Sequence, residues 1–399
     1  MNAGLGRPWK RGDCCAAAPF CLDFDRLAAY NKRQQAVGIR DWELGNREQG
    51  ITKRHFTAAY CLFTLRIGMK SMDNKKIIIG VDGGGSKSIG AAADESGRVL
   101  AVYRGGGINY YQTGMDRARS NLKEIVAALE SACGGACILL SVGMPALDTT
   151  ADESTLRAFA GDVFDPQSLI LESDACMALE GVTGGDKGMI VICGTGSMAL
   201  LDDGNGQRAA GGWGYLLGDP GSGYSIAMAG LRATIRQWEG TGPETGLGER
   251  ALAHYGLKHP RDLIALIYNS ACGPDTVARF AGEIFEAAEK GDGEAERILK
   301  EEMRSIAWQA ASLLRSAPDV EKVGLYGGIF QHQPLARRLF ADALRARLPG
   351  RPLQIVKPEF PPEIGALIRA FKYRGELNAE RLAALKISYE QWIKDKGSV

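Results

Sequence analysis

The 399-residue sequence has almost no net charge, because 48 lysines and arginines offset 47 aspartates and glutamates to leave +1. Proteins that bind nucleic acids or anionic membranes carry an excess of basic residues, so neither partner is expected. No run approaches the roughly 20 apolar residues that a membrane-spanning helix needs. The best candidate, Phe56 to Met69, is short and is interrupted by Arg66. Neither a nucleic acid nor a membrane is therefore expected as a partner.

The nine cysteines are scattered, and no C-x-x-C pair occurs among them. An odd count without regular spacing is typical of reduced thiols, which predicts a cytoplasmic protein rather than a disulfide framework. Cys133 and Cys137 enclose two glycines, which favours small-residue packing over a metal site. Near the N-terminus, Asp13 beside a short apolar patch and the lack of a clear cleavage site argue against a signal peptide.

The length of the chain, with 45% hydrophobic and 24% charged residues, is enough for two domains with their own cores. Residues 1–72 differ from the rest, because they lack sustained apolar periodicity and every motif described below follows Lys75. We expect this segment to be an appendage. Upstream sequence read through from an early start and a small helical docking element remain open alternatives.

The most informative motif is KIIIGVDGGGSKSIGAAAD, from Lys76 to Asp94. Glycine-rich loops after strands hold phosphates, because a backbone without Cβ approaches closely and points its N–H groups inward. The spacing matches neither a P-loop nor a dinucleotide-binding loop. The residues after Ser88 predict a second strand, a turn, and a third strand from Val99 to Tyr103, ended by Gly105–Gly107. The loop therefore joins antiparallel strands, either as a plain turn or as a triphosphate cradle with Asp82 at a metal ion.

The arrangement of strand, glycine turn and strand recurs in GMIVICGTGSMALLDD, from Gly188 to Asp203. Two such hairpins can hold one polyphosphate from both sides. Between them, apolar residues with helical spacing predict a helix from Met115 to Ala132. Further on, residues 275–315 are strongly helical, and GLYGGIF, from Gly324 to Phe330, is a strand and diglycine turn before another helix.

These motifs, in this order, resemble the acetate and sugar kinase, Hsc70 and actin superfamily. The resemblance is closest to the N-acetylglucosamine kinase and BadF/BadG/BcrA/BcrD-type ATPase family. It rests on VDGGGSKS, GGGINYY, ESDACMALEG, CGTGS, GGWGYLLGDPGS, the GD-x-x-A stretch at Gly291, GLYGGIF and PPEIGAL, between Lys76 and Phe371. It implies an α/β fold of two actin-like (ribonuclease H-like) domains, 73–190 and 191–375, with a nucleotide cleft between them. A helical tail, 376–399, would follow.

The resemblance also implies ATP and Mg²⁺ as cofactors, with Asp82 and Asp174 beside the metal ion. The hydroxyls of Ser86 and Thr195 would face the phosphates, and Lys87 would add charge there or remain a solvated side chain. The positions expected to contact the nucleotide are Gly83, Gly84, Gly85, Ser86, Lys87, Gly194, Thr195, Gly196, Gly327 and Gly328.

The sugar-contacting positions that the resemblance implies are Asn109, Gly212, Trp213 and Asp219. A tryptophan in a glycine loop offers a rigid face to a sugar or its acetamido methyl, and a carboxylate accepts hydrogen bonds from hydroxyls. Alternatives stay open, since Asp219 before Pro220 is also typical of a helix N-cap and N1 pair. Asn109 beside three glycines is also typical of a turn.

The catalytic base is expected after the strand ILLSVGM. In the hexosamine kinases an aspartate follows this strand directly, whereas here Met144 to Leu147 precede Asp148, so the register departs from the family's pattern. Asp148 is the candidate base for the sugar hydroxyl. A loop aspartate capping a helix near Ala151 is the alternative.

The function implied is ATP-dependent phosphorylation of an amino sugar, with N-acetylglucosamine at O6 as the first expectation. Glucosamine and N-acetylmuramic acid are alternative substrates, and a homodimer is left open. A BadF-type ATPase that activates a dehydratase or reductase is a second class, but that branch lacks the GGWG…GD loop. A sugar sensor without turnover is a third.

Overall fold

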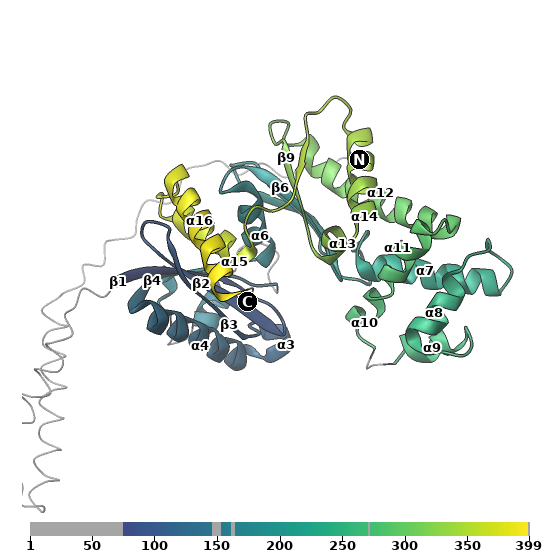
Figure 1. The fold of residues 1–399 in the computed structure, drawn as a ribbon, viewed down its shortest axis with the longest axis horizontal. Helices are drawn as coiled ribbons and strands as arrows, with labels where there is room; N and C mark the ends of the chain where they lie inside the picture. Colours follow the sequence, from purple (N-terminus) through teal and green to yellow (C-terminus); the bar gives the residue numbers. More distant parts are fainter. Residues whose placement is uncertain (1–74, 146–152, 161–163, 270–271, 398–399) are drawn as a thin grey trace, which may run out of the picture. The chain divides into compact units, whose positions relative to one another are not determined.

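The computed structural model describes residues 75–145, 153–160, 164–269 and 272–397, which lie in the compact unit Asn74–Val399 (Figure 1). The expected appendage, 1–72, and the candidate base Asp148 lie outside the described residues. Within the described part of the chain, no helix is long and apolar enough to cross a membrane.

The first sheet has five strands in the order β3-β2-β1-β4-β5. Their bounds are Lys75–Asp82 (β1), Lys87–Asp94 (β2), Val99–Gly106 (β3), Gly135–Gly143 (β4) and Leu169–Glu172 (β5). The predicted antiparallel hairpin of β1 and β2 is confirmed, and β4 and β5 run parallel to β1. The expectation that Gly105–Gly107 ends β3 is wrong for its first two glycines. A Cβ at Gly105 would lie 2.5 Å from the Ile125 side chain, so glycine there lets a helix approach the strand.

Successive side chains of β1 point to opposite faces of the first sheet, so the core around this sheet has two layers. Ile77, Ile79 and Val81 pack with helix α4 (Met115–Cys133) on one face, whereas Ile78 packs on the other face with α15 (Pro362–Tyr373) and α16 (Ala379–Lys396). The predicted helix at 115–132 is confirmed. Its buried residues have the expected helical spacing: Ala118, Leu122, Ile125 and Leu129. The shorter elements of this part are α3 (Tyr110–Thr113), α5 (Glu153–Ala160), η2 (Pro166–Ser168) and α6 (Asp174–Thr183).

The second sheet repeats the topology of the first, with the order β10-β9-β6-β7-β8. Its strands are Gly188–Cys193 (β6), Ser197–Asp202 (β7), Gln207–Gly211 (β8), Lys322–Tyr326 (β9) and Gln354–Val356 (β10). The associated helices are α7 (Gly223–Trp238), α8 (Leu247–Tyr255), α9 (Asp262–Ile267), α10 (Pro274–Ala278), α11 (Ala281–Glu289), α12 (Gly293–Arg315), α13 (Gly328–His332) and α14 (Pro334–Arg347). The predicted hairpin of β6 and β7 is confirmed. Helix α6 contacts strands of both sheets, β4 in the first and β6 and β9 in the second.

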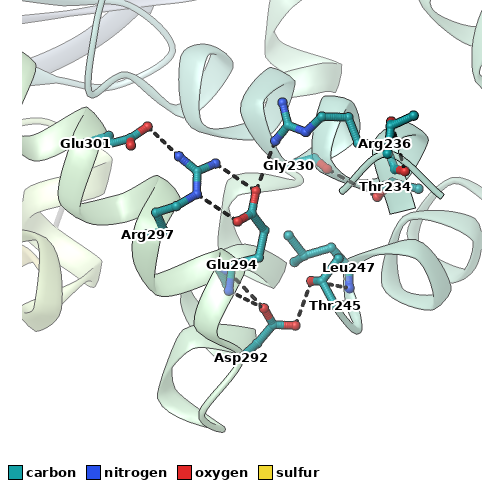
Figure 2. A network of polar contacts seen from close by, with 11 residues as sticks. Gly230, Thr234, Arg236, Thr245, Leu247, Asp292, Glu294, Arg297 and Glu301 are labelled. Atoms are coloured by element: carbon teal, nitrogen blue, oxygen red, sulfur yellow. Dashed lines mark hydrogen bonds and ion pairs between the residues drawn. The ribbon is translucent and has the colours of Figure 1, made fainter. Parts of the chain in front are cut away.

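The GD-x-x-A stretch forms a structural clamp at the start of α12 (Figure 2). Asp292 is the N-cap, and its Oδ1 accepts from two backbone N–H groups of the first turn. Its Oδ2 accepts from the Thr245 hydroxyl and from the next backbone N–H, both at 2.7 Å. The Glu294 carboxylate, 5% exposed, is held by Arg297 through two bonds of 2.7 Å and by Arg236 at 3.0 Å. These contacts fix α12 against α7 and the start of α8.

Helix α16 follows the last family motif and packs onto the first sheet. Leu385 is completely buried in the core layer beneath β3. The backbone N–H of Val99, the first residue of β3, donates to the Ser388 hydroxyl at 2.8 Å. The Tyr389 hydroxyl donates to Glu363 Oε1, also at 2.8 Å. The helix is therefore part of the folded unit and connects the outer strand β3 to the N-terminus of α15.

Candidate functional site

The first glycine loop lies where β1 and β4 end side by side. The Gly83 N–H donates to the Gly143 carbonyl at 2.8 Å, and a Cβ on Gly83 would lie 2.4 Å from that oxygen. The Gly84 carbonyl accepts from the N–H groups of Ile108 and Asn109, at 3.0 and 3.2 Å. Glycine is therefore required here by close backbone contacts, and the loop is tied to the segment that carries the predicted sugar-binding asparagine.

Asn109 lies in a turn beside the first glycine loop. Its Oδ1 accepts from the Tyr111 N–H at 3.1 Å and caps the short helix α3, so the turn interpretation is confirmed. Its backbone N–H is bonded to Gly84, which places the residue directly beside the first glycine loop. The cap uses only the side-chain oxygen. A sugar oxygen would accept a hydrogen bond from the other part of the side chain, the amide NH₂.

Three carboxylates gather at this edge of the first sheet. The pKa of Asp82 is raised to about 7, mainly by burial and then by the nearby charges of Glu363 and Asp174, whereas the charge of Lys87 lowers it. Burial also raises the pKa of Asp174, the first residue of α6, whose Oδ1 accepts the Ala175 N–H at 2.8 Å. Glu363 was not predicted as a site residue. It is 4% exposed, and burial raises the pKa of its carboxyl as well.

This carboxylate set fits a hydrated magnesium ion. No group of three or more metal-ligating side chains forms a ready cage among the described residues. Mg²⁺ usually binds through one or two carboxylates and completes its shell with water and phosphate oxygens. Asp82 and Asp174 supply that donor type, and burial is the main cause that raises the pKa of each carboxyl.

The second glycine loop, Gly194–Gly196, is held at the N-terminus of α7. The N–H groups of Gly223 and Tyr224 donate to the carbonyls of Gly194 and Thr195, at 2.7 and 3.4 Å. The Thr195 hydroxyl is exposed and donates to Asp275 Oδ1 at 2.5 Å. This hydroxyl and the loop are thus positioned by α7 and α10 rather than by the hairpin alone.

The predicted adenosine turn lies against the second loop. Gly327 has φ +94°, and a Cβ there would lie 2.4 Å from the Cys193 carbonyl, next to Gly194. Gly328 opens helix α13. The preceding residue, Tyr326, has its pKa raised by burial and then by the charges of Asp82, Glu363 and Asp174. The carboxylates of Asp82, Glu363 and Asp174 thus lie close enough to Tyr326, just before the predicted adenosine turn, to influence its pKa.

Asp219 is not a helix cap, so that alternative is wrong. Helix α7 begins at Gly223 with Ser222 as its N-cap, three residues later. Asp219 instead has φ +59°, the only positive φ of a non-glycine residue in the described ranges. Its side chain is buried, and its Oδ1 has no hydrogen-bond partner among the described residues. A Cβ on Gly196 would lie 2.7 Å from Asp219 Oδ2, so this carboxylate lies against the second glycine loop.

The loop that carries Asp219 is anchored by α12. The N–H of Gly221 donates to Glu302 Oε2 at 2.7 Å, and burial raises the pKa of this glutamate. Gly221 has φ +79°, and a Cβ there would lie 2.8 Å from Ile306 of the same helix. The Ser197 hydroxyl donates to the carbonyl that follows Asp219, at 2.7 Å. Glu302 was missed from sequence, because a single glutamate in a long amphipathic helix gives no signal.

Trp213 and Gly212 lie at the exposed start of the same loop. The Trp213 side chain is 73% exposed, and Gly212 has φ +72°. A Cβ on Gly218 would lie 3.2 Å from Trp213 Cβ, so the tryptophan is close to the residue that precedes Asp219. The structure thus brings together Trp213, Asp219 and the second glycine loop. It brings Asn109, Asp82 and Asp174 together with the first loop.

Comparison with known proteins identifies the family of the chain. The model of the BadF/BadG/BcrA/BcrD ATPase family matches residues 79–370. The chain belongs to this family. An N-acetylmuramic acid/N-acetylglucosamine kinase of Clostridium acetobutylicum is 31% identical over 58% of this chain and 77% of its own. An N-acetyl-D-glucosamine kinase of Dictyostelium discoideum is 27% identical over 74% of this chain and 98% of its own.

A solved structure from Chromobacterium violaceum, provisionally named N-acetylglucosamine kinase, superposes with a TM-score of 0.59 at 25% identity. It covers 73% of this chain and 98% of its own. The family resemblance expected from the motifs is confirmed, as is the α/β fold with two actin-like domains. The family match ends at 370, so in this BadF/BadG/BcrA/BcrD ATPase family member α16 lies beyond the shared region.

Proposed function

We propose that the protein is an ATP-dependent kinase that transfers the γ-phosphoryl group to an amino sugar, N-acetylglucosamine at O6. The observation that carries this proposal is the Asp219 carboxylate. A buried acceptor atom without a donor costs free energy, and a sugar hydroxyl is a donor that would satisfy it. Its position against Gly196 would hold that sugar next to the phosphates. The relatives that phosphorylate N-acetylglucosamine support the choice of substrate.

The other predicted residues have consistent roles in this proposal. The two glycine loops, Gly83–Lys87 and Gly194–Gly196, would enclose the phosphates, and the adenosine would lie against Gly327 and Gly328. Trp213 would present its ring to the sugar, and Asn109 would contact it from the first glycine loop. Sugar binding would satisfy the free oxygen of the aspartate and cover the exposed indole.

We further propose Mg²⁺ as the cofactor, held by Asp82 and Asp174. When bound, it would neutralise the negative charge that develops on the phosphates during transfer. Asp148 remains the proposed base that takes the proton from the attacking hydroxyl. Phosphoryl transfer then forms one O–P bond to the sugar and breaks one to ADP, and the hydroxyl proton leaves with the base.

The proposed organisation follows the motifs. Residues 73–190 and 191–375 would form the two domains on either side of the nucleotide, and 376–399 a helical tail. Residues 1–72 would lie outside the catalytic unit. All five cysteines in the described ranges are free thiols, which supports the proposed cytoplasmic location.

A coupled ADP-release assay over N-acetylglucosamine, glucosamine, N-acetylmuramic acid and glucose tests the proposal. We expect the highest kcat/KM with N-acetylglucosamine, and a phosphorus–carbon coupling at C6 in the NMR spectrum of the product. ATP turnover that is independent of every sugar would contradict the kinase assignment. A brown, iron-containing protein after anaerobic purification would support the activator class instead.

A further inference from the structure

The loop that follows β8 carries four large side chains, and one of them differs from the others. We call residues 212–218 the tryptophan loop. Trp213, Leu216 and Leu217 are 73%, 78% and 84% exposed, whereas Tyr215 is 41% exposed. Of the four, the Tyr215 side chain is therefore covered most by the rest of the protein.

Glycines make the backbone of the tryptophan loop adaptable. Gly212 and Gly214 have φ +72° and +80°, in the region that glycine enters without strain. The N–H of Gly212 donates to the Ser197 carbonyl at 3.1 Å, and the N–H of Gly218 donates to the Gly214 carbonyl at 2.8 Å. The first bond anchors the loop to β7, and the second lies within the loop. The orientation of the loop's tip therefore depends also on its side-chain contacts.

The Tyr215 ring lies against the ring of Tyr224. The ring centroids are 4.7 Å apart and the ring planes are inclined at 57°, which is an arrangement typical of favourable aromatic pairs. Tyr224 is the second residue of α7 and packs against the core around the second sheet. The pair thus connects a largely exposed loop to a fixed part of the fold.

Tyr224 also contacts the second glycine loop through its backbone. Its N–H donates to the Thr195 carbonyl at 3.4 Å, and the N–H of Gly223 donates to the Gly194 carbonyl at 2.7 Å. One residue therefore joins the loop proposed to enclose the phosphates to the loop proposed to hold the sugar. Because its backbone contacts the first loop and its ring contacts the second, substitution of the ring separates the two roles.

We propose that Tyr215 and Tyr224 are positioning residues, whose paired rings hold the Trp213 indole in the orientation that receives the sugar. This inference rests on the proposed function, because it concerns the same sugar site. In this role neither tyrosine contacts the sugar. Aromatic pairs of this kind shift an equilibrium by about 2- to 10-fold, so loss of the pair lowers the population of the correctly oriented loop by about that factor.

Initial-rate kinetics with N-acetylglucosamine and ATP test the positioning role. Tyr215→Ala and Tyr224→Leu should each raise the sugar KM by about 2- to 10-fold, with kcat and the ATP KM nearly unchanged. Tyr215→Phe keeps the ring and should behave like the wild type. The double variant, with Tyr215→Ala and Tyr224→Leu in one chain, should be no worse than either single variant, because both remove the same contact. Tyr373→Ala, which removes an exposed ring on α15, is the matched control.

Limited digestion with chymotrypsin gives a readout that does not depend on turnover. In the protein without ligands, Tyr224→Leu should increase the rate of cleavage after residues 213–217 by about 2- to 10-fold, because a released loop is open to the protease more often. Mass spectrometry of the fragments identifies the cleaved bonds. A wild-type protein without sugar-dependent turnover would refute the proposed function, whereas the digestion would still show whether the rings hold the loop.

Three results in an active enzyme would overturn the positioning role. An unchanged sugar KM in Tyr215→Ala would show that the ring pair does not affect the site, and this variant leaves the core intact. Additive losses in the double variant would show that the two tyrosines act separately. A Tyr215→Phe variant as impaired as Tyr215→Ala would show that the hydroxyl acts directly on the sugar.

Discussion

Replacement of Asp219 separates its role in sugar binding from its role in the fold. Asp219→Asn keeps the shape of the side chain, and asparagine tolerates the left-handed backbone that φ +59° requires. The variant should therefore fold with nearly wild-type stability. A hydrogen bond to a charged acceptor is worth about 1.5–3 kcal/mol, so its weakening should lower kcat/KM for the sugar by about 10- to 150-fold. ATP affinity should change much less.

Asp219→Ala should behave differently in one respect only. It should lose at least as much activity, and it should also lose about 1–2 kcal/mol of stability, because alanine has no local hydrogen bond to offset a left-handed conformation. Burial raises the pKa of Asp219, so wild-type sugar binding should weaken as the pH falls through that raised value, while Asp219→Asn should lack this change. The assays are initial-rate kinetics with varied sugar at saturating ATP and thermal unfolding, with exposed Asp186→Asn as control. An unchanged kcat/KM in folded Asp219→Asn would refute the assignment.

Four further predictions address the rest of the site and the fold. Asp82→Asn should lower turnover by orders of magnitude. Without ligands, Asp82→Asn should also be more stable toward denaturant than the wild type above neutral pH. The Asp82 pKa is raised to about 7, so the wild-type protein loses stability as the pH rises through that value, and the variant does not. Glu302→Ala should raise the sugar KM more than the ATP KM in initial-rate kinetics. Glu302→Gln should raise the sugar KM less than Glu302→Ala does, because its amide oxygen can still accept the Gly221 N–H. Asp292→Ala should lower the free energy of unfolding by about 1–2 kcal/mol, and Asp292→Asn should lower it by less. Because the pKa of Asp292 is lowered in the folded protein, the stability that its carboxylate contributes should be lost as the pH falls through this lowered pKa. Removal of residues 1–70 should leave sugar-dependent ADP release intact, and a folded but inactive product would show that the segment belongs to the site.

The parts of the fold that the sequence predicts are those determined by local pattern. Apolar runs on both sides of a glycine turn predict the β1–β2 and β6–β7 hairpins, because no helix can continue through such turns. The spacing of Leu122, Ile125 and Leu129 predicts the buried side of α4, because helical periodicity alone identifies it. These features need no information from distant segments.

The parts that fail depend on contacts between distant segments. The run GDPGS contains two residues suited to cap a helix, Asp219 and Ser222, and local rules favour the one before proline. The structure selects Ser222, because Gly221 is held by Glu302 and packs on Ile306, both from a helix far along the chain. Glu363 was missed for a related reason. The only sign in the sequence was an acidic residue within the apolar run PPEIGAL. Its position beside Asp82 becomes apparent only in the fold, where α15 packs against β1.

Helix α16 has a consequence for the solubility of the folded chain. Strand β3 is the outermost strand of the first sheet, and an outermost strand offers unpaired backbone groups to the strands of other molecules. The Ser388 hydroxyl occupies the N–H of Val99 at the start of that strand, and Leu385 covers the apolar layer beneath it. A chain cut at the end of the family match would keep every glycine loop yet expose this strand to self-association. We therefore expect the C-terminal helix to limit aggregation of the folded chain, a role that the glycine-loop motifs do not supply.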